Sequence, residues 1–258
     1  MTPKTNSLNR SLFLYFVIIA IVVVALISLA YEDILTTKEI AGFLLATLGT
    51  FLGAFFAFRL NEHKDKDKII REQKKALNRA LFILGRQQNV LLLLNEHLSL
   101  FKNEFERTFN LPALSLPSYP DLIQNFQELD FLFESSQPNI LMMLAIEQER
   151  FYQTMESIRI RNTFYVNEVL PEIHRLELNH KELTLSQISK VLGEKIFGEA
   201  INGTRSLYFH VEQGNKSISE LLETLFKLAK EIFPDERFPK FERDPNLSAI
   251  PKVDIYRS

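Results

Sequence analysis

The sequence predicts an all-α protein in which a two-span transmembrane hairpin, with both termini inside, precedes a stalk helix and a cytoplasmic helical bundle. Three observations predict this fold class. Two uncharged apolar runs stand in the first quarter of the 258 residues, and an apolar residue then recurs at every seventh position. The remaining segments carry apolar residues at intervals of three and four, which is the spacing of one helix face.

The two apolar runs predict the transmembrane hairpin, residues 12–60. The first run, 12–30, reads LFLYFVIIAIVVVALISLA, and the second, 41–58, reads AGFLLATLGTFLGAFFAF. Each is close to the ~20 residues that an α-helix needs to cross a ~30 Å hydrocarbon core. Two consecutive helices that are apolar on every face are rare in a soluble core. A short extracytoplasmic loop, 31–40, would connect the two spans.

The charges beside the two runs predict the orientation. Basic residues stand in the short tail 1–11 and again after the second run, whereas the loop 31–40 carries one lysine and three acidic residues. Because lysine and arginine stay on the cytoplasmic side, both termini are expected in the cytoplasm, beneath a bacterial inner membrane. In an alternative reading, Ser28-Leu29-Ala30 is a signal-peptide cleavage site, but the first run exceeds the ~7–15 residues of a signal h-region.

Small residues follow one face of the second predicted span. The stripe recurs at spacings of three and four, contains a GxxxG unit and consists of Gly42, Ala46, Gly49, Gly53 and Ala57. Small side chains let two helix backbones approach closely in lipid. The stripe therefore predicts packing against the first span or, nearly as well, against a second copy of the chain.

Alternating charges follow the second span and predict a solvated stalk. Residues 61–75 have almost no apolar face, so they cannot pack into a core. The basic residues expected to lie near the lipid surface are Arg59, Lys64, Lys66 and Lys68. Each contributes about 1 kcal/mol of attraction to anionic lipid.

A heptad pattern follows the stalk. Its seam consists of Ile70, Leu77, Leu84, Leu91, Leu98 and Phe105, with Gln73 and Gln87 as polar interruptions at the companion positions. A seam of this kind is typical of a coiled coil or a helical bundle. Residues 61–110 are therefore predicted to form one long helix, of which 77–110 packs into the bundle.

The rest of the bundle, 111–234, is predicted to begin with two helices. After a proline-containing loop, a short helix begins at Asp121. A longer helix opens at Pro138, in the first-turn position that proline tolerates, and ends at Pro171.

Two further helices complete the predicted bundle. Thr184 is the expected N-cap of one helix, which ends at Gly214. Ser217-x-x-Glu220 reads as a capping box for the last helix, which stops at Pro234. The helical spacing runs through Gly203 in phase, so a helix is preferred there to a hairpin turn.

The proline-containing tail, 235–258, is predicted to be extended or disordered. Phe238 and Phe241 are expected to pin it to the bundle.

Familiar signatures of catalysis are missing from the sequence. The absence of cysteine excludes disulfides, thiol catalysis and cysteine-ligated metals. No Walker A, GxGxxG, GxSxG or HExxH motif is present. The pair Glu177-x-x-His180, with His174 nearby, lacks the second such motif that a ferritin-like di-iron site needs. No catalytic, metal or cofactor-binding residues are therefore assigned, and no cofactor is expected.

These observations favour a non-enzymatic, membrane-tethered interaction or signalling module. Its expected partners are the lipid bilayer, further copies of the chain and an unknown cytoplasmic protein, whereas a net charge of −2 offers no field for nucleic acid. The layout is similar in outline to that of two-span effectors of bacterial anti-phage systems, which damage their own membrane. This likeness implies the alternative, a self-assembling membrane-perturbing effector, but lies in no motif and implies no site residues. An enzyme with an unrecognised site is the third hypothesis.

Overall fold

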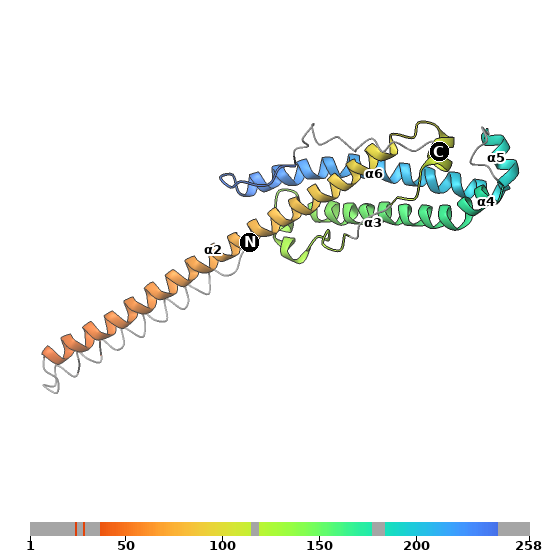
Figure 1. Ribbon diagram of the computed structural model, residues 1–258. Helices are drawn as coiled ribbons and strands as arrows, with labels where there is room; N and C mark the ends of the chain where they lie inside the picture. Colours follow the sequence, from red (N-terminus) through yellow and green to blue (C-terminus); the bar gives the residue numbers. More distant parts are fainter. Residues whose placement is uncertain (1–23, 25–27, 29–36, 115–118, 177–183, 242–258) are drawn as a thin grey trace. The chain divides into compact units, whose positions relative to one another are not determined.

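A computed structural model describes residues 24, 28, 37–114, 119–176 and 184–241 of the chain, and every regular element among them is helical (Figure 1). The all-α fold class is therefore confirmed for this part of the chain. The α-helices are α2 (Thr37–Leu98), α3 (Ile140–Phe164), α4 (Leu170–Arg175), α5 (Leu185–Leu192) and α6 (Glu194–Ile232). The π-helices are η1 (Glu106–Asn110) and η3 (Tyr165–Val169), and η2 (Gln127–Glu134) is a 3₁₀-helix. The chain divides into two compact units, Met1–Ile69 and Ile70–Ser258.

The described part of the first unit is essentially the beginning of α2. Within the described residues, α2 is the one helix that is long and apolar enough to cross a membrane, judged by length and composition. Its most apolar 18-residue window has a mean hydropathy of 1.9, and none of that window is buried. The first predicted span, 12–30, lies outside the described residues except for Val24 and Ser28. One candidate span is thus described, and the two-span hairpin stays a prediction.

Of the loop predicted at 31–40, residues 37–40 are helical, because α2 begins at Thr37, and residues 31–36 lie outside the described part of the chain. The segment Thr37–Ile40 contains neither glycine nor proline, so nothing in it opposes extension of the helix toward its N-terminus.

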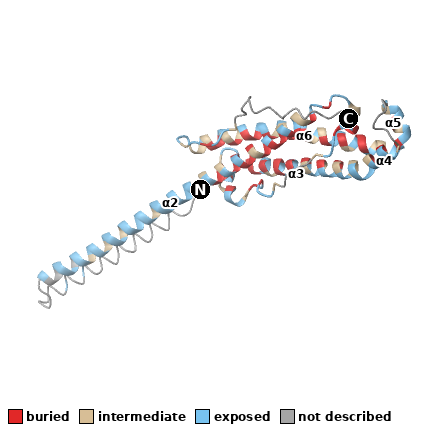
Figure 2. Ribbon diagram, viewed as in Figure 1, coloured by how far each residue is buried: buried red, intermediate tan, exposed pale blue. Residues whose placement is uncertain are grey.

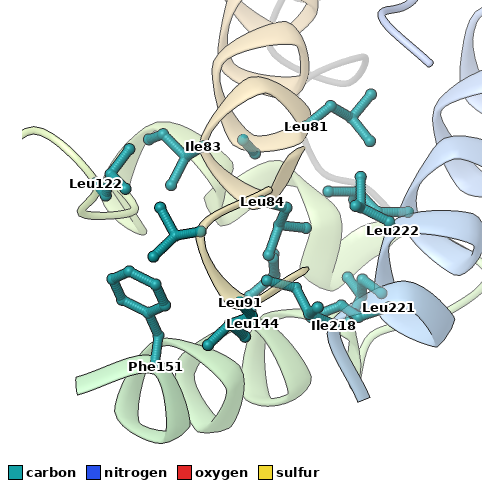
Figure 3. Packing of buried hydrophobic residues seen from close by; sticks show 14 of the residues in the cluster. Leu81, Ile83, Leu84, Leu91, Leu122, Leu144, Phe151, Ile218, Leu221 and Leu222 are labelled. Atoms are coloured by element: carbon teal, nitrogen blue, oxygen red, sulfur yellow. The ribbon is translucent and has the colours of Figure 1, made fainter. Parts of the chain in front are cut away.

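Three helices build the core of the second unit: the part of α2 after Ile69, α3 and α6. Helices α3 and α6 run side by side in opposite directions (Figure 1). Apolar side chains from all three meet in one cluster, shown in Figure 3. Leu91 of α2, Leu144 of α3 and Ile218 of α6 are each 0% exposed. Burying one such side chain contributes about 1.5–3 kcal/mol, so the apolar faces of the three helices hold this unit together.

The helix predicted to continue to residue 110 ends at Leu98, so this expectation was wrong. The chain turns after Leu98 and becomes helical again just before η1. Asn103 Oδ1 accepts a hydrogen bond from the backbone N–H of Glu106 at 2.9 Å, and the Glu106 carboxylate accepts from Asn103 Nδ2 at 2.8 Å. Such local side-chain bonds offer the backbone an alternative to the continuing helix. The spacing Asn-x-x-Glu was the signal that the heptad pattern concealed.

The short helix predicted to begin at Asp121 was also misplaced. A 3₁₀-helix, η2, begins six residues later at Gln127, and residues 122–125 are not helical. Two buried glutamines use the backbone of this segment: Gln87 Nε2 donates to the Leu122 carbonyl at 3.0 Å, and Gln148 Oε1 accepts from the N–H of Gln124 at 3.2 Å. Because the Leu122 carbonyl and the Gln124 N–H bond to side chains of α2 and α3, they form no helical hydrogen bonds within this segment.

Pro171 does not end the helical run that begins near Pro138. Helix α3 starts at Ile140, and the chain passes through η3 into α4, where Pro171 occupies the first turn. A first-turn proline loses no intrahelical hydrogen bond, and the wider π-helical turn of η3 precedes it. The proline therefore changes the hydrogen-bonding pattern of the run without ending it.

The helix predicted from Thr184 to Gly214 divides at Gly193. Thr184 is the N-cap of α5 as predicted, and it forms a capping box with Gln187. Gly193 then separates α5 from α6 with φ at 80°, a backbone conformation that favours glycine.

Helix α6 continues through Gly203, as predicted, and through Gly214, where an end was predicted. A Cβ added to Gly214 would lie 3.0 Å from Leu91 Cδ1 of α2. Gly214 therefore allows α6 to approach α2 closely, and it does not end the helix. Ser217 does not cap a new helix, because it lies inside α6, which continues to Ile232.

The chain leaves α6 at Ile232, in agreement with the stop predicted at Pro234. Phe238 is 9% exposed, and the ring of Phe241 lies 3.4 Å from the position of a Cβ on Gly85. Both rings pack against the second unit, as the sequence predicted. Residues 242–258 of the predicted tail lie outside the described part of the chain.

Candidate functional site

The first part of α2 presents an apolar surface that no described residue covers. Figure 2 shows this part of the helix as exposed almost throughout. Leu45 is 71% exposed and Phe56 is 65% exposed. The five residues of the small-residue stripe are exposed as well: Gly42, Ala46, Gly49, Gly53 and Ala57. Among the described residues, no atom lies within 4 Å of a Cβ built on Gly42, Gly49 or Gly53. Within the described part of the chain, therefore, nothing packs on the stripe.

The stalk after this segment is helical and charged. Residues 61–72 are all exposed except Glu62, which is half-buried. Lys66 Nζ donates to Glu62 at 2.8 Å, and Arg59 lies 3.5 Å from the same carboxylate. These two cations hold the pKa of Glu62 below its ordinary value, with the Lys66 hydrogen bond the larger cause. Arg59 also lies 5.7 Å from the ring centroid of Phe55. Of the predicted basic cluster, Lys64 and Lys68 are exposed on the same helix.

Four of the six seam residues are buried in the core of the second unit. Leu77, Leu84 and Leu91 are 0% exposed, and Leu98 is 1% exposed. Ile70 is 40% exposed, because the buried face of α2 begins at Ala76. Phe105 lies beyond the end of α2 and packs in a second apolar cluster with Phe109. The seam is therefore real between residues 77 and 98, and it ends where the helix ends.

A layer of buried amides crosses this core. Gln87 Nε2 donates to Gln148 Oε1 at 3.2 Å, and Gln124 Nε2 donates to the Ala80 carbonyl at 3.2 Å. Three amide atoms in the layer have no partner: Gln87 Oε1, Gln124 Oε1 and Gln148 Nε2. Buried polar groups of this kind select one register of a helical bundle over others. The sequence pattern identified Gln87 as an interruption but not its partners on other elements.

A buried carboxylate stands beside this layer. Glu147 of α3 is 2% exposed, and it accepts a hydrogen bond from Ser217 Oγ of α6 at 3.0 Å. Arg150 lies 3.5 Å from it but is itself half in solvent. Burial raises the pKa of Glu147 above its ordinary value, against the hydrogen bond from Ser217 and the charge of Arg150.

Arg161 is the buried cation of the second unit. It lies on α3 and is 4% exposed. Its guanidinium donates to the carbonyls of Pro112 at 2.8 Å, Thr108 at 3.4 Å and Leu111, which close the end of η1. It lies 4.4 Å from the ring centroid of Tyr165. Among the described residues, no carboxylate forms an ion pair with it. Burial accordingly lowers the pKa of Arg161 to about 10.

A pocket of about 270 Å³ opens beside Arg161. Residues of η1, α3, η3 and α6 line it, and the apolar ones are Ile160, Phe164, Val169, Ala200 and Gly203. Thr108 and Thr204, which are 1% and 3% exposed, are also among the lining residues, and their hydroxyl oxygens are buried. Neither hydroxyl has a hydrogen-bond partner. The pocket thus combines a buried cation with an apolar wall, and two buried threonines with unsatisfied hydroxyl groups border it. A mostly apolar pocket with a few polar groups is typical of a small-molecule site.

Sequence reasoning missed this pocket, although one signal was present. Apolar residues at helical spacing run along α3 through Phe151 and Ile158 to Tyr165, and Arg161 lies three residues after Ile158 on the same face. A charged residue in phase with a buried stripe indicates a buried charge. Thr108 and Thr204 carried no comparable signal. They line the same pocket only because η1 and α6 both border it, and no local pattern shows this.

The residues weighed as metal ligands do not come together in the described part of the chain. No group of three or more metal-binding side chains occurs there, and His174 is exposed on α4. Glu177 and His180 lie outside the described residues.

Comparison with known protein families, curated proteins and solved structures finds no match, so the function is inferred from these residues and their geometry alone.

Proposed function

We propose that this protein is a two-pass membrane protein whose hairpin, 12–60, tethers a cytoplasmic helical domain that binds a protein partner without catalysing a reaction. Both termini lie in the cytoplasm of a bacterial cell, and the stalk connects the inner membrane to the domain. The single observation that carries the proposal is the exposed apolar window of α2, which has a mean hydropathy of 1.9 and no buried residue.

Lipid is the covering that this window requires. Apolar surface left in water costs roughly 25 cal/mol per Å², and soluble monomers rarely expose large contiguous apolar patches. Side chains such as Leu45 and Phe56 are exposed around the helix, and the glycine stripe is exposed with them. A helix that is apolar on every face suits a bilayer and not a protein core. Arg59 and the stalk cations follow directly, at the place where anionic headgroups attract positive charge.

Exposed apolar side chains on the second unit support binding to another protein. Phe133 at the end of η2 is 62% exposed, and Met142 at the start of α3 is 65% exposed. Phenylalanine and methionine are enriched at protein interfaces, and methionine adapts to partners of different shape. The absence of familiar catalytic motifs from the sequence favours binding over catalysis.

In-cell crosslinking of the tagged full-length protein, followed by mass spectrometry, tests this proposal. The expected result is a reproducible foreign protein, captured from a membrane fraction that resists carbonate extraction. Reporter fusions at both termini should be active only in the cytoplasm. Recovery of the protein in the soluble fraction, or a terminus outside the cytoplasm, would overturn the membrane-tether proposal.

The second candidate function is a self-assembling effector that permeabilises its own membrane. The open glycine stripe favours it, because Gly49 and Gly53 have no neighbour among the described residues and small-residue stripes drive helix pairing in lipid. Membrane potential should then fall on activation, and Gly49→Ile with Gly53→Ile should prevent the fall. Leu52→Ile, which lies off the stripe, is the matched control. Capture of only the chain's own copies by crosslinking, together with depolarisation, would favour this candidate.

A further inference from the structure

We propose that the pocket beside Arg161 binds a small organic monocarboxylate with an apolar body. The proposal is independent of the membrane tether, because every residue that lines the pocket belongs to the second unit.

The charge of Arg161 is the first reason for an anionic ligand. Arg161 is 4% exposed, and the described partners of its guanidinium are neutral carbonyl oxygens and the Tyr165 ring. A buried charge without a counter-charge is costly, since desolvation is repaid only in part by dipoles. A carboxylate in the adjoining pocket would supply the missing negative charge, and the lowered pKa of Arg161 would rise again.

Two buried threonines that border the pocket have unsatisfied hydroxyl groups, which rotation of the side chains would bring toward a ligand. Thr108 Oγ1 and Thr204 Oγ1 are buried without a hydrogen bond, although both residues line the pocket. A helical threonine ordinarily bonds to the carbonyl four residues earlier, as Thr154 does to Arg150 at 2.9 Å. Unsatisfied buried hydroxyls are uncommon and indicate a ligand or a water that completes them.

The remaining lining limits the ligand to one negative charge and an apolar body. Ile160, Phe164 and Val169 form an apolar wall that suits a short aliphatic or aromatic group. Glu199 is exposed and also lines the pocket. Its carboxylate would repel a phosphate dianion more strongly than a monocarboxylate. A volume of about 270 Å³ admits a small molecule and not a peptide.

Isothermal titration calorimetry of the detergent-solubilised full-length protein tests the proposal with two matched probes. The probes are 4-methylpentanoate and its neutral amide, 4-methylpentanamide. We expect the acid to bind at least about tenfold more tightly than the amide, because a hydrogen bond to a charged group contributes more than one to a neutral group. Equal binding of the two probes, or no binding of the acid, would overturn the proposal.

Two pairs of variants assign the binding to this pocket. Gly203→Leu fills the pocket and should abolish binding of the acid, whereas Gly198→Leu lies on the same helix outside the lining and should not. Thr204→Val should weaken binding by about tenfold through the lost hydrogen bond, and the exposed Thr163→Val should leave it unchanged. Circular dichroism confirms that each variant is folded. Acid binding that survives Gly203→Leu in a folded protein would place the ligand elsewhere and refute this site.

Discussion

The two parts of α2 use one helix in opposite ways. Before Ile69, large apolar side chains are exposed, with Leu48 at 50% and Leu52 at 48%. After Ala76, the leucines of the seam are buried, and both Leu84 and Leu91 are 0% exposed. Figure 2 shows this change along the helix. The difference lies in the arrangement of apolar residues and not in their number.

The arrangement of apolar residues indicates which surroundings each part of α2 requires. An apolar side chain on every face of a helix leaves no face for water, so lipid is the suitable solvent. An apolar stripe with polar residues opposite fits a protein core. The same residue, leucine, therefore indicates a bilayer in one part and a bundle in the other, and substitutions should separate the two roles.

The largest effect is expected from Leu84→Asp combined with Leu91→Asp. Each change places an unpaired carboxylate in the core, at a cost of several kcal/mol. The two together should exceed the roughly 5–15 kcal/mol that stabilises a domain. Circular dichroism of the full-length protein should show lost helicity and no cooperative melting. Leu93→Asp on the same helix, where Leu93 is 47% exposed, is the control. Unchanged helicity and melting in the double variant would show that the seam does not hold the bundle.

The next largest effect is expected from Leu48→Arg with Leu52→Arg. Arginine at the centre of a membrane helix costs about 2.5–3.5 kcal/mol per residue for insertion. The double variant should move from the carbonate-resistant membrane fraction to the soluble fraction or be degraded. Ile69→Arg is the matched control, because Ile69 is 53% exposed in the same helix but follows the apolar window. Unaltered membrane retention of the double variant would contradict a span in α2.

The periodic parts of the fold were predictable from the sequence, and the junctions were not. Buried stripes on α2, α3 and α6 follow from spacing alone, and so does the Thr184 N-cap. After α2 ends at Leu98, hydrogen bonds between Asn103 and Glu106 compete with a continuing helix, and a heptad pattern does not reveal them. Proline and glycine are poor helix formers in general, so the sequence predicts helix ends at Pro171 and Gly214. Their places in the structure depend on the π-helical turn and on Leu91.

The two candidate sites also differ in how far the sequence predicts them. The small-residue stripe on α2 belongs to one helix, so spacing alone identifies it, whereas its packing partner stays a prediction. The Arg161 pocket joins residues that are far apart in the sequence, such as Thr108 and Thr204, and no local pattern connects them. The one sequence signal for this pocket was Arg161, a charged residue on an otherwise apolar helix face.

Glycine substitutions compare a packed position with an open one. Gly214→Ala brings a methyl group to 3.0 Å from the fully buried Leu91, and overpacking of this kind costs about 1–3 kcal/mol. Gly198→Ala meets no atom within 4 Å and replaces a poor helix former, so it should stabilise α6 by about 0.5–1 kcal/mol. Thermal melting followed by circular dichroism should give shifts of opposite sign. Shifts of the same sign would mean that α2 and α6 do not approach closely at Gly214.

The smallest expected effect concerns two carboxylates, one from each part of the molecule. Burial raises the pKa of Glu147 from its ordinary value of 4.5, so the folded state disfavours the ionised form. The stability contributed by neutral Glu147 is complete below pH 4.5 and is lost as the pH rises through the raised pKa. Glu147→Gln should therefore melt at a higher temperature than the unsubstituted protein near pH 7, and the gap should close toward pH 4.5.

Glu62 provides the control of opposite sign. The Lys66 hydrogen bond and Arg59 lower its pKa, so its contribution is present above pH 4.5 and is lost as the pH falls through the lowered pKa. Glu62→Gln should melt slightly lower near pH 7 or not change, since exposed ion pairs contribute little. A gap for Glu147→Gln that is constant from pH 4.5 to pH 8 would mean that this carboxylate is solvated. Glu147 would then resemble Glu62 of the stalk, and the contrast between a solvated stalk and a closed core would fail at this residue.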